Sequence, residues 1–123
     1  MSPQDFELEQ ELDFVQADVR AAVLPFHREF RADVVVTNPP FGTRSQGADL
    51  DFLRAAARIA SKAIYSLHKK STRDYLTKFA YRELRAKSAE VLAELRYDLP
   101  STYKFHKRSS IDIEVDLWRI ELS

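Results

Sequence analysis

The sequence predicts an α/β fold in three layers, with a largely parallel sheet between helices. Residues 32–37 form a continuous β-branched run, which is typical of a strand buried on both faces. Apolar residues recur at helical spacing from residue 50 to residue 64. Residues 111–117 alternate apolar and acidic side chains, as in a strand with one buried face. Strands that alternate with helices favour parallel pairing through crossover connections.

The elements are expected in the order strand, strand, helix, strand, helix, strand, strand. A short apolar run at residues 12–19 predicts the first strand. The second strand, at residues 32–37, must end at Asn38, because neither of the two following prolines can donate to a strand ladder. Asp49 is the expected N-cap of the first helix, and residues 63–67 are the next expected strand.

The second half continues the alternation of helix and strand. Ser71 or Thr72 is expected to cap a second helix, because apolar side chains follow at helical spacing. Those side chains are Leu76, Phe79, Ala80 and Leu84. Residues 91–97 predict a strand and residues 98–110 a loop. The last strand, at residues 111–117, suits an antiparallel or edge position.

The composition excludes several classes of protein. With 123 residues, one domain is expected. The 19 Lys and Arg residues balance 19 Asp and Glu residues, which excludes a uniformly basic nucleic-acid binder. The absence of cysteine excludes disulfides and cysteine-based zinc sites. No run approaches the roughly 20 apolar residues that span a bilayer, and the acidic N-terminus does not resemble a secretory signal. The protein is therefore expected inside the cell, in the nucleus or the cytoplasm.

The segment Asn38-Pro39-Pro40-Phe41 stands where chemistry is expected, because ligands of open α/β sheets bind at the carboxyl ends of strands. The two prolines restrict the backbone, so the Asn38 amide and the Pro39 carbonyl are preset acceptors. Two such acceptors can hold an exocyclic amine, while Phe41 stacks on the ring that bears the amine. The alternative is an ordinary turn after a buried strand.

A second polar signal is Asp18, at the end of the first expected strand. Its carboxylate can accept a hydrogen bond from the adenine amine of a cofactor. The alternative is a solvated aspartate in a turn.

Basic side chains gather in two stretches that could face a phosphate backbone. Lys69, Lys70 and Arg73 end a stretch, residues 52–73, that contains no acid. A later loop interleaves bases with aromatic residues, as binding of single-stranded nucleic acid requires. Its residues include Lys104, Phe105, His106, Lys107 and Arg108. The alternative for both stretches is a solvated surface.

Three acids, Asp112, Glu114 and Asp116, alternate along the last expected strand. We expect them on a solvent-facing side, where charge prevents a sheet edge from pairing with other chains. A nuclease-type metal site is the alternative reading, although no metal is expected. His68 and His106 are expected on the surface or behind the site, and neither is expected to assist a nucleophile.

Several long stretches resemble a known family. They are FVQADV (14–19), VVVTNPPFGTR (34–44), KAIYSLHKKSTR (62–73), AELRYDLPSTYKFHKRSS (93–110) and IDIEVDL (111–117). Together they resemble the C-terminal part of the methyltransferase-like protein five family. Its members use S-adenosylmethionine to form N6-methyladenosine in small-subunit rRNA. NPPF is shared by many amino-methyltransferases, whereas YSLHK and the block from LRYDLP to YKFHK narrow the resemblance to this family.

The resemblance implies a partial Rossmann-like class I methyltransferase sheet with flanking helices, in one incomplete domain at residues 1–123. Asn38 and the Pro39 carbonyl would hold the adenosine N6 amine, and Pro40 and Phe41 complete the catalytic motif. Asp18, together with Asn38, would contact S-adenosylmethionine. Residues 104–108 resemble a segment implicated in RNA contact.

The chain departs from the family at its N-terminal end. The family has an upstream strand with a glycine-rich cofactor loop, whereas both glycines here, Gly42 and Gly47, follow the NPPF motif. We therefore expect a truncated or alternatively started product, or an incomplete gene model, that lacks the first strands. The resemblance also implies a small zinc-binding activator protein along residues 12–19. Whether the chain is active alone stays open; the alternative function is a non-enzymatic short isoform that binds RNA or the activator.

Overall fold

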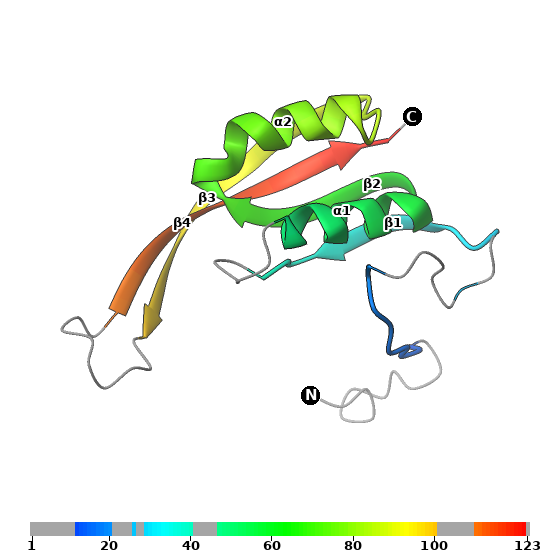
Figure 1. The fold of residues 1–123 in the computed structure, drawn as a ribbon, viewed down its shortest axis with the longest axis horizontal. Helices are drawn as coiled ribbons and strands as arrows, with labels where there is room; N and C mark the ends of the chain where they lie inside the picture. The colour runs from blue at the N-terminus through cyan, green and yellow to red at the C-terminus, as the bar shows by residue number, and fades with distance from the viewer. Residues whose placement is uncertain (1–11, 21–25, 27–28, 41–46, 101–109, 123) are drawn as a thin grey trace.

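The computed structural model describes residues 12–20, 26, 29–40, 47–100 and 110–122. These residues build one mixed sheet of four strands with two α-helices (Figure 1). The elements are β1 (Ala32–Thr37), α1 (Ala48–Ile59), β2 (Ala60–Lys69), the 3₁₀ turn η2 (Lys70–Thr72), α2 (Arg73–Arg82), β3 (Ser88–Pro100) and β4 (Ser110–Glu121). The α/β class predicted from the sequence is confirmed.

The strand order in the sheet is β1-β2-β4-β3. β1 and β2 are parallel, with Thr37 opposite Ser66, and α1 forms the crossover between them. β4 is antiparallel to both β2 and β3. The antiparallel pairing predicted for the last strand is therefore confirmed, whereas an edge position is wrong. β3 forms a hairpin with β4 and takes the edge itself.

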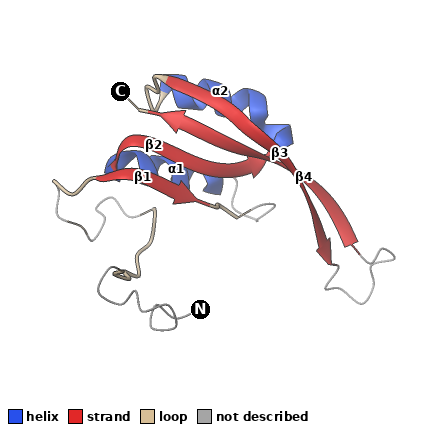
Figure 2. Cartoon of the chain, turned by 180° about the vertical axis from the view of Figure 1, so that it is seen from behind, coloured by secondary structure: helices blue, strands red, loops and turns tan. Residues whose placement is uncertain are grey.

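Both helices cover the same face of the sheet, as Figures 1 and 2 show from opposite sides. The hydrophobic core lies between the helices and this face. It consists of Leu53, Ala56, Ala60, Ile64, Leu76, Phe79, Ala80, Trp118 and Ile120. The apolar stripe predicted for the second helix is therefore a core face. The predicted three-layer arrangement is wrong for the described part of the chain, which has two layers.

β1 shows this one-sided covering most clearly. Val35 packs against the core, whereas Val34 and Val36 are 46% and 78% exposed on the opposite face. The prediction that residues 32–37 are buried on both faces is wrong here. A β-branched run identifies a strand, but burial of its two faces depends on which other elements cover them.

The same substitution at two neighbouring positions of β1 tests this arrangement. Val35→Thr is expected to lower the free energy of unfolding by about 1–2 kcal/mol, because it places a hydroxyl against the core. Val36→Thr is expected to change it by less than about 0.5 kcal/mol, because the side chain faces solvent. Urea denaturation measures both. Equal losses at the two positions would contradict a sheet that is covered on one face only.

Two predictions near the N-terminus are wrong in the described structure. The strand predicted at residues 12–19 is not formed, and the side chains of residues 12–18 are exposed. Helix α1 begins at Ala48, after Gly47, whose φ of 79° is a left-handed conformation that glycine adopts readily. Asp49 therefore lies in the first turn of α1 and is not its N-cap.

The later elements have the predicted order but are longer. β2 is ten residues long and extends beyond residues 63–67 at both ends. β3 and β4 continue into the loop predicted at 98–110, because their hairpin pairing extends to Pro100 and Ser110. Thr72 precedes α2 as predicted. Its hydroxyl donates to the Lys69 carbonyl and makes no cap bond to the helix.

Candidate functional site

The Asn38-Pro39-Pro40 segment follows directly on β1. Because β1 and β2 are parallel, their carboxyl ends lie side by side, with Thr37 opposite Ser66. Pro39 is fully buried, whereas Asn38 and Pro40 are exposed. The segment thus combines a fixed backbone with an amide that solvent and ligands can reach. Phe41 lies outside the described residues.

Asp18, the residue predicted to contact a cofactor, is exposed in a turn. Its Oδ1 atom accepts a hydrogen bond of 2.9 Å from the Arg20 backbone N–H. The Arg20 side chain in turn lies 3.6 Å from an Asp51 carboxylate oxygen on α1. The turn is therefore attached to α1, and the Asp18 carboxylate stays open to solvent.

The carboxyl end of β2 carries a polar cluster that the sequence did not predict. His68, expected on the surface or behind the site, is 1% exposed, so the surface position is wrong. Its Nε2 atom lies 2.7 Å from Ser66 Oγ. On the other side of the ring, Nδ1 lies 3.6 Å from Oδ2 of Asp49 on α1. The same oxygen accepts a hydrogen bond of 2.8 Å from the Tyr75 hydroxyl on α2. We call Asp49, Ser66, His68 and Tyr75 the His68 cluster; it joins β2, α1 and α2.

Burial decides which groups in the His68 cluster are charged. Loss of hydration lowers the pKa of His68 below 6.5, against the opposing effect of the Asp49 and Asp116 carboxylates. A neutral imidazole has one donor and one acceptor nitrogen, and the carboxylate beside Nδ1 favours the proton there. Nε2 then accepts from the Ser66 hydroxyl. Burial also raises the pKa of Tyr75 to about 12, so its hydroxyl stays a donor to Asp49.

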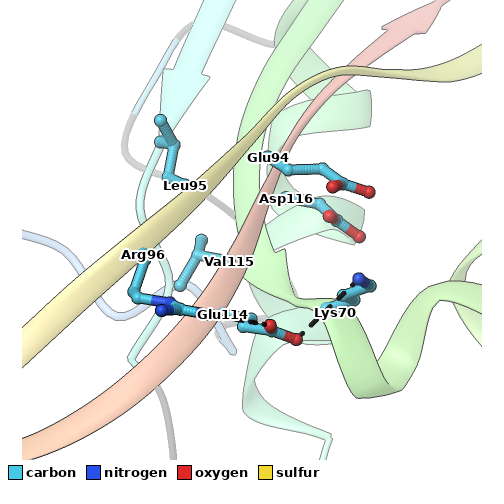
Figure 3. Close-up of a pocket in the computed structure, with 7 residues that line it drawn as sticks. All are labelled: Lys70, Glu94, Leu95, Arg96, Glu114, Val115 and Asp116. Carbon is cyan, nitrogen blue, oxygen red and sulfur yellow. Dashed lines mark ion pairs between the residues drawn. The ribbon is translucent and has the colours of Figure 1, made fainter.

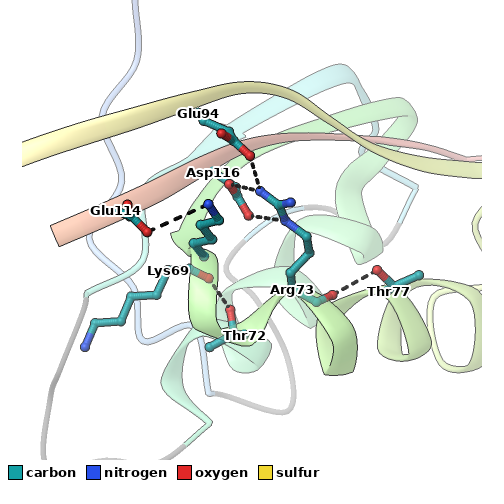
Figure 4. Close-up of polar contacts among 8 residues, drawn as sticks. Lys69, Thr72, Arg73, Thr77, Glu94, Glu114 and Asp116 are labelled. Atoms are coloured by element: carbon teal, nitrogen blue, oxygen red, sulfur yellow. Dashed lines mark hydrogen bonds and ion pairs between the residues drawn. The ribbon is translucent and has the colours of Figure 1, made fainter.

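A second polar group joins α2 to the hairpin (Figure 4). Arg73 donates two hydrogen bonds to Asp116, of 2.9 and 2.6 Å, and one of 2.8 Å to Glu94. Asp116 is fully buried on the helix-covered face of the sheet. The prediction that Asp116 faces solvent is therefore wrong. The Arg73 guanidinium of α2 neutralises the buried carboxylate, and the alternating pattern of the strand does not reveal this partner. Hydrogen bonds to these carboxylates raise the pKa of Arg73.

The Glu94 carboxylate gives this group a measurable pH dependence. The hydrogen bond from Arg73 holds the pKa of Glu94 below its usual 4.5. A depressed carboxyl pKa stabilises the fold above 4.5, and this stabilisation is lost as the pH falls through the folded-state pKa. Glu94→Gln is therefore expected to be less stable than the unchanged chain at pH 7, with the difference shrinking at pH 3. Urea denaturation at both pH values measures this, and a difference independent of pH would contradict it.

Lys69, Lys70 and Arg73 differ in how closely carboxylates approach their side chains. Lys70 lies 3.8 Å from Glu114, and Arg73 is held by its two carboxylates. Lys69 forms no ion pair with the described residues, and its side chain points away from the others (Figure 4). The five residues from Lys104 to Arg108 lie outside the described ranges. The three basic residues are therefore close in the chain, but the Lys69 side chain does not join those of Lys70 and Arg73, and their role in binding stays a prediction.

A cavity of about 190 Å³ opens beside these residues on the hairpin (Figure 3). It is lined by Lys70, Glu94, Leu95, Arg96, Glu114, Val115 and Asp116. Carboxylates outnumber cations there, which disfavours a phosphate group. Within the described residues, no three His, Cys, Asp or Glu side chains are placed to hold a metal ion. The nuclease-type alternative therefore has no support in this part of the chain, where the Asp112 side chain is not described.

Among the described residues, no helix is both long and apolar enough to cross a membrane.

The comparisons with known proteins agree with this picture. No family model matches the chain. It is 50% identical over 117 residues to the rRNA N(6)-adenosine-methyltransferase METTL5 of Danio rerio, covering 94% of this chain and 54% of the relative. It is 49% identical over 113 residues to the rRNA N(6)-adenosine-methyltransferase Mettl5 of Drosophila melanogaster, covering 90% and 51%. Among solved structures, a candidate RNA methyltransferase of Pyrococcus horikoshii matches with a TM-score of 0.59 and 31% identity, covering 85% of this chain and 48% of that one.

The chain thus spans about half the length of the curated relatives it matches. These identities confirm the family resemblance, and the structural match confirms the Rossmann-like methyltransferase sheet at the level of the fold.

Proposed function

We propose that this chain, a homologue of the METTL5 rRNA N(6)-adenosine methyltransferases over about nine tenths of its length, carries the base-binding part of an RNA N6-adenine methyltransferase. The observation that carries the proposal is the Asn38-Pro39-Pro40 segment at the carboxyl end of β1, with its buried proline and exposed amide. Residues 1–123 would then be a single, incomplete methyltransferase domain acting inside the cell, in the nucleus or the cytoplasm, on small-subunit rRNA.

The acceptors in this segment fit an adenine amine. The Asn38 side-chain oxygen and the Pro39 carbonyl accept the two N–H bonds of N6 and thereby aim its lone pair. The same oxygens stabilise the positive charge that grows on N6 as a fourth bond forms. Phe41 would stack on the base. The chain's own contribution is therefore positioning and charge stabilisation.

S-adenosylmethionine, when bound, would supply the methyl group: the bond between its sulfonium sulfur and the methyl carbon breaks as the bond to N6 forms, a neutral thioether leaves, and N6 then loses one proton. Two exposed groups among the described residues fit parts of S-adenosylmethionine: the Asp18 carboxylate is an acceptor for its adenine amine, and Asn38 borders the transfer site. A glycine-lined cradle for its methionine part is not found in the described ranges, where Gly47 leads into α1. The proposal therefore assigns to this chain only the adenine contact and the substrate amine.

The RNA contact is proposed for Lys69 and for residues 104–108. Lys69, which forms no ion pair with the described residues, and residues 104–108 would face the RNA backbone and unpaired bases. Lys70 and Arg73 have carboxylates at 3.8 and 2.6 Å, so a smaller share of the affinity is expected from them. The alternative is a protein that binds RNA or the activator without catalysis. The carboxylates beside Lys70 and Arg73 do not favour this alternative, because they neutralise two of the cations that would bind RNA.

The exposed segment before β1 supports the proposed activator partner. Leu12, Phe14 and Val15 are 43%, 77% and 54% exposed, and their backbone pairs with no described strand. An extended apolar segment of this kind can add as a strand to the sheet of another protein. A small zinc-binding activator protein is the partner proposed for residues 12–19.

Methyl transfer to RNA tests the proposed function. The protein, as isolated from its cells with any bound partner, is incubated with methyl-labelled S-adenosylmethionine and small-subunit rRNA that lacks modification. We expect label in N6-methyladenosine after digestion to nucleosides and mass spectrometry. Label in another nucleoside would assign a different substrate, and RNA binding without transfer would favour the non-enzymatic alternative.

A further inference from the structure

The His68 cluster connects both flanks of the Asn-Pro-Pro segment. Ser66 lies opposite Thr37, the residue before Asn38, in the pairing of β1 with β2. Asp49 lies in the first turn of α1, which begins at Ala48 directly after Gly47. His68 contacts Ser66 through one ring nitrogen and approaches Asp49 with the other. The imidazole therefore bridges β2, which pairs with the end of β1 before Asn38, and α1, the helix that follows the Asn-Pro-Pro segment.

The surroundings hold this imidazole in place without using it for chemistry. His68 and Ser66 are 1% and 0% exposed, so neither can touch a substrate. The charged groups around the ring are Asp49 on α1 and Asp116 on β4, with Arg73 of α2 bound to Asp116. Tyr75 of α2 donates to Asp49 from the other side. Nδ1 has no hydrogen bond in the described part of the chain, which leaves its approach to Asp49 as its one polar contact.

We propose that His68 is a positioning residue: through Ser66 and Asp49 it fixes the start of α1 against the end of β1 and so sets the placement of the Asn38 and Pro39 acceptors. The inference rests on the proposed function, because those acceptors matter only if they bind the reacting amine. His68 would not contact the substrate itself but would set the geometry of the Asn38 and Pro39 acceptors that do.

The protonation of the ring gives the proposal a pH signature. The folded protein keeps the imidazole neutral below 6.5, where the unfolded chain is already protonated. The unfolded state then binds more protons, so stability falls as the pH drops below about 6.5. The neutral ring keeps its contact with Ser66 in the folded protein at neutral pH. His68→Phe has no group to titrate here, so it is expected to lose less stability than the unchanged protein when the pH falls below about 6.5.

Three variants separate positioning from simple folding. His68→Phe removes both polar contacts, Asp49→Asn removes the carboxylate, and His68→Asn keeps an amide near the Nδ1 position. Steady-state methyl transfer is measured with the protein as isolated from its cells, from pH 5.5 to 8. His68→Phe and Asp49→Asn are each expected to lower kcat about 10- to 100-fold, with KM for S-adenosylmethionine within about twofold. His68→Asn is expected to recover most of the loss.

Two further comparisons make the test specific. The double variant of His68→Phe and Asp49→Asn is expected to be no slower than the slower single variant, because both substitutions break the contact between His68 and Asp49. Tyr81→Phe, the matched control, removes a tyrosine hydroxyl of the same helix that accepts a hydrogen bond of 3.1 Å from the Ala89 backbone N–H outside the His68 cluster, and a change in kcat below about threefold is expected. Unchanged kcat in His68→Phe, or losses that multiply in the double variant, would overturn the positioning role.

A readout independent of methylation separates the inference from the proposed function. The side-chain amide of Asn38 gives resonances in a ¹H–¹⁵N spectrum. We expect them to shift in His68→Phe and Asp49→Asn and to return in His68→Asn. If the unchanged protein methylates no RNA, the proposed function fails, and the amide resonances still decide the positioning role. Amide resonances that stay in place in both damaging variants would overturn it.

Discussion

Replacing Asn38 by alanine is expected to lower methyl transfer by about 100- to 1000-fold, the usual effect of removing one group that stabilises transition-state charge. The side chain is exposed at the end of β1 and is not part of the core, so the fold is expected to keep its stability. The loss should appear in kcat, because the acceptor acts mainly as charge grows on N6. Steady-state kinetics with labelled cofactor measure it, and thermal unfolding of the same sample checks the fold.

A second substitution at the same position identifies which atom of the amide matters. Asn38→Asp keeps oxygen acceptors and removes the NH₂ group, so it is expected to be about tenfold more active than Asn38→Ala. If Asp and Ala are equally inactive, a donor at this position does the work and the assignment of Asn38 as an acceptor is wrong. An alanine variant within about threefold of the unchanged protein would remove Asn38 from the site.

Replacing Trp118 by alanine is expected to cost about 3–5 kcal/mol of unfolding free energy, because it removes a large side chain from the core. Trp118 is 2% exposed and lies on β4 opposite Ser66, within the core cluster. Small domains are stable by only about 5–15 kcal/mol, so this variant should be largely unfolded at moderate urea concentrations. Equilibrium denaturation followed by circular dichroism measures the shift in midpoint.

Trp118→Phe is the matched control for the cavity. The indole N–H has no hydrogen-bond partner in the described structure, so phenylalanine loses volume but no hydrogen bond. A cost of roughly 1–2 kcal/mol is expected. If Phe and Ala cost the same, a polar contact of the indole, and not its volume, would be the stabilising feature.

Local sequence patterns predicted the type of each helix and strand better than they predicted which of its faces is buried. The alternation at residues 111–117 and the stripe at Leu76 and Phe79 gave the correct type of element, because both follow from backbone periodicity. Which faces are covered could not be predicted in the same way. Val36 is exposed and Asp116 is buried, each against its pattern, because the covering helices and Arg73 come from distant parts of the chain.

Only the part of the candidate site that lies in one continuous segment was predicted from the sequence. Asn38 and Pro39 were found because a strand end followed by prolines is visible in a few consecutive residues. The His68 cluster was missed because its members are separated by up to 26 residues in sequence. The alternation of Ile64, Ser66 and His68 along β2 was a usable signal for a buried histidine. No local pattern shows that the start of α1 brings Asp49 beside it.

The last strand of the sequence lies in the middle of the sheet, between β2 and β3. During synthesis, residues 110–121 therefore leave the ribosome after every segment that they pair with. Until then, β2 and β3 have no common partner and their edges are open to other chains. The sheet consequently gains its central strand only after β2 and β3 have both been made. A premature stop codon ahead of β4 would remove the centre of the sheet and leave no folded product to accumulate.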